Sequence, residues 1–379
     1  MMGASQDERL LETQHELRAL VPEAPNCVRI LDQTELPWRV HVRRLDSLDA
    51  VAEAIRTLAV RGAPLIGAAS AFGCALALSR AAKADDEVLT HALTTLAATR
   101  PTAVNLHWAL ARMATRLRPL PSSARAAAAW AEAQAILDED AASCAAIGRH
   151  GLTVLLDRVG SRRDRRPLQI MTHCNAGWLA TAAYGTALAP VYAAHARGID
   201  MHVWVSETRP RNQGLLTAWE LARAGVAHTL VADNAAGWLL ATGQVDLVLV
   251  GADRIATNGD VANKIGTYLK ALAAGDRGVP FCVAAPVATI DWGCAHGDAI
   301  QIEARGGDEL RWQSSAKGPV RIAGADTPVA NPAFDITPAR LVTALISERG
   351  IARAGRLAAE LAAWRPRDGA NGGGHGPRG

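Results

Sequence analysis

The chain has 379 residues, of which 49% are hydrophobic, and its formal net charge at pH 7 is +3. This length predicts two domains with sizeable apolar cores, and so small a charge excess argues against nucleic acid as a partner. The six cysteines include no CxxC pair and the histidines no HExxH, which excludes a disulfide scaffold and the common zinc motifs. We therefore expect no metal.

Neither the first residues nor the apolar segment of the chain has the pattern expected of a signal peptide or a membrane span. Residues 1–20 are charged and lack the apolar core of a signal peptide. The apolar segment 62–78 is short and rich in Gly and Ala, which is atypical of a membrane span. Residues 365–379 are rich in Gly, Pro and Arg and are expected to form a disordered tail. These features predict a cytoplasmic protein with no membrane partner.

The first part of the chain is predicted to be mainly helical. Two short strands, 28–31 and 40–42, surround a polar turn that ends in Pro37, which indicates a small antiparallel sheet. Helical periodicity then recurs at 48–60, 66–80, 85–99 and 122–156. The last of these is expected to be broken once or twice and to connect the domains. We assign residues 1–140 to this N-terminal domain.

The pattern changes after residue 168 to repeated units of strand, polar loop and helix. The expected strands are 168–172, 201–205, 228–231, 247–250 and 281–284. Such units predict a Rossmann-like, doubly wound parallel sheet, which we assign to residues 141–364. A further strand at 300–303 and helices at 338–349 and 357–364 are expected to complete the domain. No GxGxxG follows its first strand, so no dinucleotide cofactor is expected.

Two side chains at the expected carboxyl ends of strands are candidates for chemistry. Cys174 follows the strand 168–172, and Asp253 follows the strand 247–250. Ligands of open α/β sheets bind at this edge, and a helix N-terminus favours the thiolate of a nearby cysteine. The alternatives are that Cys174 is a small buried apolar residue and that Asp253 caps a turn. A thiol facing a carboxylic acid would supply one base and one acid.

Polar residues suited to a sugar phosphate lie in other loops. Arg61 and Arg100 each stand in a turn with a nearby proline, just before a helix, where exposed backbone N–H groups favour an anion. Either arginine alone could instead be a surface residue of a structural turn. The amide of Gln213 and the pair Asn263 and Lys264 could bind hydroxyl groups and charge. Together these groups favour an isomerase or a lyase over a kinase or a dehydrogenase.

The motifs that contain these residues resemble those of methylthioribose-1-phosphate isomerases, in the superfamily that includes the α, β and δ subunits of translation initiation factor 2B. The resemblance runs in order from residue 28 to residue 350. The matching segments are 31–37, 61–64, 100–106, 172–177, 207–210 with 213–214, 251–255, 258–260, 263–267 and 331–335. Leu65 stands where the family pattern leads us to expect Ala, and residues 304–330 diverge.

The resemblance implies a site and a reaction. Cys174 and Asp253 would be the catalytic pair of an aldose–ketose isomerase that acts on 5-methylthioribose 1-phosphate in methionine salvage, without a cofactor. The remaining site residues that it implies bind substrate: Arg61, Gly62, Ala63, Arg100, Gln213, Asn263 and Lys264. It also implies a homodimer formed through the C-terminal domain.

Three questions stay open at this point. The substrate could be a related pentose phosphate, such as 5-deoxyribose 1-phosphate or ribose 1,5-bisphosphate. The hydrogen at C2 could move as a proton through an enolate or as a hydride. In a different class of function, the chain could be a regulatory translation-factor subunit, although such relatives are expected to lack the pair formed by Cys174 and Asp253.

Overall fold

The computed structural model describes residues 12–13, 16–25, 27–162, 164 and 166–365. The chain divides into two compact units, Met1–Ala145 with Trp178–Gly185 and Arg365–Gly379, and Ala146–Gly177 with Thr186–Trp364. The predicted disordered tail lies, apart from Arg365, outside the described residues. The domain division at residue 140 stays a prediction from the sequence.

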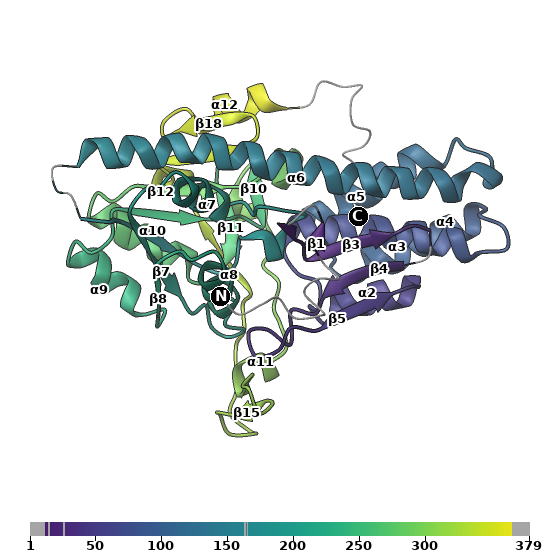
Figure 1. Cartoon of the computed structure of the whole chain (residues 1–379), viewed down its shortest axis with the longest axis horizontal. Helices are drawn as coiled ribbons and strands as arrows, with labels where there is room; N and C mark the ends of the chain where they lie inside the picture. Colours follow the sequence, from purple (N-terminus) through teal and green to yellow (C-terminus); the bar gives the residue numbers. More distant parts are fainter. Residues whose placement is uncertain (1–11, 14–15, 26, 163, 165, 366–379) are drawn as a thin grey trace. The chain divides into compact units, whose positions relative to one another are not determined.

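The first unit combines a small antiparallel sheet with a group of helices, as predicted (Figure 1). Its strands are β3 (Leu20–Glu23), β4 (Cys27–Leu31) and β5 (Val42–Leu45), besides the short pair β1 (Glu12–Thr13) and β2 (Glu16–Leu17). Its helices are α2 (Leu48–Arg56), α3 (Ala63–Arg80), α4 (Asp86–Ala97), α5 (Val104–Leu117) and the beginning of α6 (Ser122–Ser161). By length and composition α3 could cross a membrane, but 72% of it is buried inside the structure, as in the central helix of a core.

Helix α6 runs unbroken for 40 residues, so the interruptions predicted from the sequence are wrong. Two glycines inside the helix allow close contact with a neighbouring helix. A Cβ on Gly151 would lie 2.2 Å from Cγ of Pro190, and a Cβ on Gly148 would lie 3.3 Å from that of Ala189. Both neighbours belong to helix α7 (Leu188–Ala196). The missing side chains therefore let two helices approach closely, and the alanine-rich sequence sustains the helix through both glycines.

The second unit is built on a seven-stranded sheet in the order β18-β17-β12-β9-β6-β7-β8. All neighbouring strands are parallel except the edge pair β17 and β18, which confirms the predicted α/β class. The strands are β6 (Leu168–Thr172), β7 (Met201–Ser206), β8 (His228–Val231), β9 (Leu247–Val250), β12 (Phe281–Ala284), β17 (Ala344–Ser347) and β18 (Gly350–Arg353).

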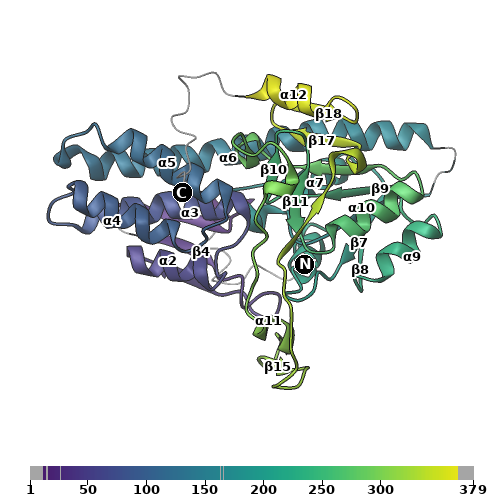
Figure 2. The ribbon, with the colours of Figure 1, turned by 180° about the vertical axis from the view of Figure 1, so that it is seen from behind.

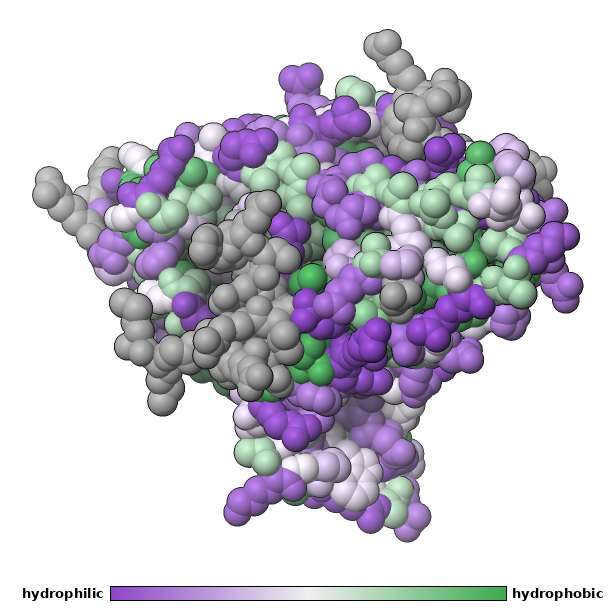
Figure 3. Space-filling view, turned by 45° about the vertical axis from the view of Figure 1, so that its right-hand side comes forward, coloured by the Kyte–Doolittle hydropathy of each residue, from purple (hydrophilic) through white to green (hydrophobic). Residues whose placement is uncertain are grey.

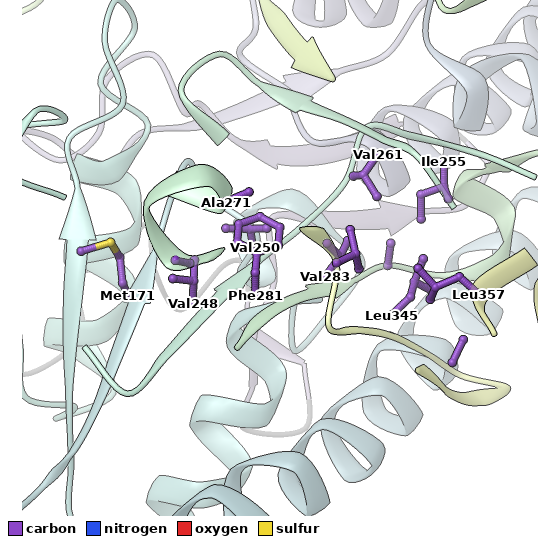
Figure 4. Close-up of a cluster of buried hydrophobic side chains, with 14 of the residues drawn as sticks. Met171, Val248, Val250, Ile255, Val261, Ala271, Phe281, Val283, Leu345 and Leu357 are labelled. Carbon is purple, nitrogen blue, oxygen red and sulfur yellow. The ribbon is translucent and has the colours of Figure 1, made fainter. Parts of the chain in front are cut away.

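Alternate residues of the central strands pack against helices on opposite faces of this sheet. Val248 and Val250 of β9 join one core with α9 (Ala235–Ala241), α10 (Thr267–Asp276) and α12 (Leu357–Trp364), shown in Figure 4. Leu247 and Leu249 join a second core with α6, α7 and α8 (Gly214–Arg223). A strand that is apolar at every position is what a sheet covered on both faces requires.

A second, four-stranded sheet was not predicted. Its order is β13-β10-β11-β16, and its strands are β10 (Arg254–Ala256), β11 (Val261–Lys264), β13 (Ile290–Asp291) and β16 (Phe334–Thr337). The helix predicted at 338–349 is wrong, because its apolar residues form β17, buried between β12 and β18. Periodicity alone cannot distinguish a short buried strand from a helix. Here the segment forms a strand because β12 and β18 provide backbone hydrogen-bonding partners on both sides.

The strand predicted at 300–303 is also absent: these residues lead instead into an arm that protrudes from the second unit (Figure 2). The arm holds α11 (Asp308–Arg311) and the hairpin β14 (Trp312–Gln313) and β15 (Val320–Arg321). Its base is closed where the amide of Arg305 donates to the carbonyl of Asn331 over 2.9 Å. Hydrophilic side chains cover most of the protruding part in Figure 3.

Candidate active site

Cys174 and Asp253 lie on either side of the point at which the strand order of the large sheet reverses. From β6 the chain proceeds to β7 and β8 on one side, then returns to place β9 on the other side of β6. Cys174 follows β6, and Asp253 follows β9, at the carboxyl ends of two adjacent parallel strands. This switch point is where doubly wound sheets bind ligands.

The two loops that carry these residues pack against each other. A Cβ added to Gly251 would lie 2.9 Å from that of Ala176, so any larger residue at 251 would separate the loops. Gly177 is equally constrained, because a Cβ there would lie 2.0 Å from Oε2 of Glu220. The glycines of both motifs thus serve the close approach of backbone segments around the site.

The Cys174 turn has an unusual backbone held by hydrogen bonds. Cys174 is half-buried and has a φ of +64°, in the left-handed region that L-residues other than glycine rarely adopt. Its amide donates to Oγ1 of Thr208 over 2.8 Å, and its carbonyl accepts from Oγ1 of Thr217 over 2.8 Å. Such strained conformations persist only where the surroundings enforce them, and they cluster at functional sites.

Lys264 is the cation of this region. It lies on β11, and only 5% of it is exposed. Its ammonium donates to the carbonyl of Ala333 over 3.0 Å and lies 4.6 Å from the ring centroid of Phe334. Burial, with the charge of Arg305, lowers the pKa of Lys264 to about 8, although the negative charges of Cys174 and Asp253 oppose the shift. The ammonium of Lys264 therefore interacts electrostatically with both Cys174 and Asp253.

Asp253 is joined to the same strand. It is half-buried, and its amide donates to the carbonyl of Ala262 on β11 over 3.0 Å. Asn263 is buried on β11, where its Nδ2 donates to Oγ1 of Thr267 over 3.1 Å. Asn263 and Lys264 are the last two residues of β11, and α10 begins at Thr267.

Two other carboxylates near these strands have structural contacts. Asp335 accepts from the amides of Gly266 and Tyr268 over 2.7 and 3.1 Å at the beginning of α10, and burial raises its pKa to about 6. Asp260 accepts from Asn258, Gly297 and Ala339 and so ties three loops together. Burial opposes ionisation of Asp260, but these hydrogen bonds outweigh it and lower its pKa.

Gln213 stands at the N-terminal end of α8, with only 6% of its surface exposed. Within the part of the chain that the structure describes, its buried Oε1 has no hydrogen-bond partner. An unpaired buried amide oxygen is costly unless a ligand donor satisfies it. This observation fits the predicted role of Gln213 in binding a substrate hydroxyl.

The predicted arginines belong to the first unit, where two helix beginnings lie side by side. Arg61 and Gly62 precede α3, which starts at Ala63, and Arg100 precedes α5 by four residues. A Cβ on Gly67, in the first turns of α3, would lie 2.9 Å from the carbonyl oxygen of Asn105 in α5. The structure therefore brings the turns of both arginines together at two helix N-termini, a setting that favours an anion.

Gly62 is required by its surroundings as well as by its backbone. Its φ is +97°, and a Cβ there would lie 2.4 Å from the backbone of Ala180. Ala180 belongs to the 3-10 turn η1 (Trp178–Ala180), whose Leu179 carbonyl accepts from Nε2 of Gln33 over 2.6 Å. The turn that carries Arg61 is thus held against residues distant in sequence.

Sequence reasoning missed several residues around the site. Thr208, Thr217 and Asp233 support the Cys174 turn, and Arg305 acts on Lys264 from the base of the arm. Thr208 lies in the segment 207–210 that matches the family, and Thr208 and Asp233 follow β7 and β8, but neither observation indicated a role in supporting Cys174. Thr217 and Arg305 gave no signal, because their contacts depend on tertiary packing. Among the described residues, no group of three or more His, Cys, Asp or Glu could hold a metal ion.

Known proteins match the chain over most of its length. Residues 59–354 match the model of the initiation factor 2 subunit family. A methylthioribose-1-phosphate isomerase of Dechloromonas aromatica is 59% identical over 87% of this chain and 91% of its own length. One of Gluconobacter oxydans is 54% identical over 86% of this chain and 90% of its own length.

Solved structures show the same fold. The crystal structure of 5-methylthioribose 1-phosphate isomerase from Pyrococcus horikoshii is 38% identical, covers 92% of this chain and 96% of its own, and has a TM-score of 0.80. A structure described as translation initiation factor eIF-2B, subunit delta, from A. fulgidus is also 38% identical, covers 90% and 97%, and has a TM-score of 0.74. The chain belongs to the initiation factor 2 subunit family and, within it, to the methylthioribose-1-phosphate isomerases.

Proposed function

We propose that the protein converts 5-methylthioribose 1-phosphate, an aldose, to 5-methylthioribulose 1-phosphate, a ketose, in methionine salvage. One observation carries the proposal: a thiol and a carboxylate flank the switch point of the sheet in a chain 59% identical to a named isomerase of this kind. The cytoplasmic location predicted from the sequence is part of the proposal.

The chemistry needs an acid and a base. The phosphate on the anomeric oxygen prevents the ring from opening spontaneously, so the ring oxygen must be protonated as the bond to C1 breaks. We assign this proton to Asp253. Cys174 then takes the hydrogen from C2 as a proton and returns it to C1, while the C2 hydroxyl gives its proton to Asp253 and becomes the ketone. Lys264 lies where it can stabilise negative charge that develops during this transfer.

The direct test is turnover of purified protein with three substrates: 5-methylthioribose 1-phosphate, 5-deoxyribose 1-phosphate and ribose 1,5-bisphosphate. Phosphorus NMR follows the change from an anomeric phosphate to a primary phosphate ester. We expect the methylthio sugar to have the highest kcat/KM, and faster turnover of either alternative would reassign the substrate. With solvent deuterium, label at C1 of the product identifies proton transfer through an enolate, whereas an unlabelled product leaves two routes, a hydride shift and a proton that Cys174 returns without exchange.

The 38% identity to a structure described as an initiation-factor subunit sustains a second reading, in which the chain regulates translation and catalyses nothing. That reading predicts no turnover of any pentose phosphate. The higher identity to named isomerases and the strained, half-buried Cys174 favour catalysis.

The phosphate is assigned to the turns of Arg61 and Arg100 at the adjacent beginnings of α3 and α5. We expect Arg61→Ala and Arg100→Ala each to raise KM about 10- to 100-fold, because a charge-assisted hydrogen bond contributes about 1.5–3 kcal/mol. KM is measured at low and moderate salt. Arg56→Ala is the matched control, since Arg56 pairs with Glu53 on the surface of α2. Unchanged KM in both site variants would show that these arginines are structural.

A homodimer through the second unit is also part of the proposal. Trp238 on α9 and Leu269 on α10 are 62% and 68% exposed. These helices pack on the same core and lie side by side in Figures 1 and 2. We expect Trp238→Glu and Leu269→Glu to convert a dimer into monomers, measured by light scattering at micromolar concentration. Leu156→Glu, at an exposed position of α6, is the control, and a monomeric wild type would contradict the proposal.

A further inference from the structure

We infer that Thr208 and Thr217 are positioning residues for Cys174, and that their hydroxyl groups hold the two peptide groups on either side of it. The inference rests on the proposed function, in which Cys174 transfers the hydrogen from C2. It concerns residues 34 and 43 positions away from Cys174 in the chain.

The hydrogen bonds that define the turn come from these two threonines. The amide of Cys174 donates to Thr208, and its carbonyl accepts from Thr217, each over 2.8 Å. The left-handed backbone of Cys174 directs its side chain differently from a relaxed backbone. Removing either hydroxyl would let the turn move toward negative φ and would carry the thiol away from its present place.

Thr208 is itself held in place by Asp233. It is fully buried, its φ is +66°, and its amide donates to Oδ1 of Asp233 over 2.9 Å. Asp233 also accepts from the amide of Arg209 over 2.7 Å and from the hydroxyl of Ser206. Burial opposes ionisation of Asp233, but these hydrogen bonds outweigh it and lower its pKa. Asp233 thus remains an anion that locks the loop after β7.

Thr217 is held by a helix. It is fully buried in α8, and while its hydroxyl donates to Cys174 it accepts from Nδ2 of Asn175 over 3.2 Å. Nδ2 of Asn175 also donates to Oε1 of Glu220, one turn further along α8, over 2.7 Å. Two successive residues of the motif are therefore fastened to one rigid element, which is how a reactive side chain is kept in a fixed geometry.

The charges around Cys174 make its position measurable. Cys174 interacts with the charge of Lys264, which in turn interacts with Asp253, Arg305 and Glu309. The adjacent His173 is neutral, because burial and the charge of Lys270 lower its pKa to about 3. Lys264 is the cation whose charge interacts with the thiolate. A thiol that moves away from this ammonium will ionise at higher pH, because a nearby cation favours the thiolate.

The test uses Thr208→Val and Thr217→Val, which keep the branched shape and remove the hydroxyl. We expect kcat to fall at least about tenfold with KM within about twofold, because binding is retained while alignment is lost. The pH midpoint of iodoacetamide alkylation at Cys174, followed by peptide mass spectrometry, should rise. The other five cysteines are buried, so labelling of the folded protein reports on Cys174.

Matched variants separate positioning from packing. Thr208→Ser and Thr217→Ser restore the hydroxyl and should restore both kcat and the midpoint. Thr337→Val removes a fully buried hydroxyl that has no partner among the described residues, and it should change neither. If one valine variant does not fold, the other variant still tests the inference, because each hydroxyl forms a separate hydrogen bond with Cys174.

Three results would overturn the inference: an unchanged alkylation midpoint in folded valine variants, unchanged kcat in them, or serine variants that behave like valine. Failure of the proposed function is a separate result. If Cys174→Ser keeps full turnover, Cys174 is not catalytic, and the alkylation profile of the threonine variants still reports whether they position the thiol.

Discussion

Cys174→Ser and Asp253→Asn are each expected to abolish isomerisation, with kcat lowered by about 10²–10⁴-fold or more, while the protein stays folded and binds sugar phosphate. Serine at 174 has a far higher pKa than the thiol and cannot serve as a base near neutral pH. The hydrogen bonds that hold the turn involve the backbone of Cys174, so the substitution leaves them in place. Asparagine at 253 keeps the size of the carboxylate but cannot transfer a proton.

The controls are a cysteine and a carboxylate with structural contacts. Cys282 is buried in β12, and Asp260 holds three loops through its hydrogen bonds. Cys282→Ser and Asp260→Asn should lower the melting temperature but retain turnover per folded molecule. Turnover, melting temperature and binding are measured together. Normal turnover in either site variant removes that residue from the mechanism, and normal turnover in both would show that other groups carry out the catalysis.

Lys264→Met is expected to remove activity and, below about pH 8, to raise the free energy of unfolding. Burial lowers the pKa of Lys264 from 10.5 to about 8, so holding its charge in the folded state costs on the order of 3 kcal/mol. Methionine avoids this cost but removes the charged donor that Lys264 supplies to the carbonyl of Ala333, which still accepts from the amide of Ile265; the lost hydrogen bond offsets about 1.5–3 kcal/mol. The net gain in stability is therefore about 1 kcal/mol, whereas the loss of the cation from the site removes turnover.

The lowered pKa of Lys264 also predicts how the stability of the protein changes with pH. Between about pH 8 and 10.5, Lys264 is protonated in the unfolded chain but neutral in the folded one, so the unfolded state binds more protons. The stability of the wild type must then rise with pH relative to Lys264→Met across this window. Urea unfolding at pH 7, 8, 9 and 10 measures the difference. Lys317→Met, on the exposed arm, should run parallel to wild type. A parallel curve for Lys264→Met would show that its charge is not buried at a cost.

The sequence predicted the large sheet because its central strands are apolar at every position and are separated by polar loops. The prediction failed at 344–347. The four residues of β17 are all buried, but they lie within a longer segment for which we predicted a helix. The second sheet was missed because its strands are short and include Asn263 and Lys264. Polar residues are expected at the surface, but tertiary contacts bury these two.

The catalytic candidates could be predicted for a positional reason. A thiol and a carboxylate that directly follow apolar strands must lie at one edge of a parallel sheet, whatever the details of the fold. The groups that fix them could not be predicted in this way. Thr208 and Thr217 contact Cys174 only because β7 and α8 fold beside the loop after β6, and the sequence holds no local mark of that contact.

The return of residues Trp178–Gly185 to the first unit has a consequence for synthesis of the protein. When the ribosome has completed residues 1–145, the first unit still lacks Ala180, against which Gly62 is packed, and the Leu179 carbonyl that accepts from Gln33. An independent domain could finish folding as it emerges, but the N-terminal part of this chain cannot. It must wait, partly ordered, until β6 and the Cys174 turn have also been made.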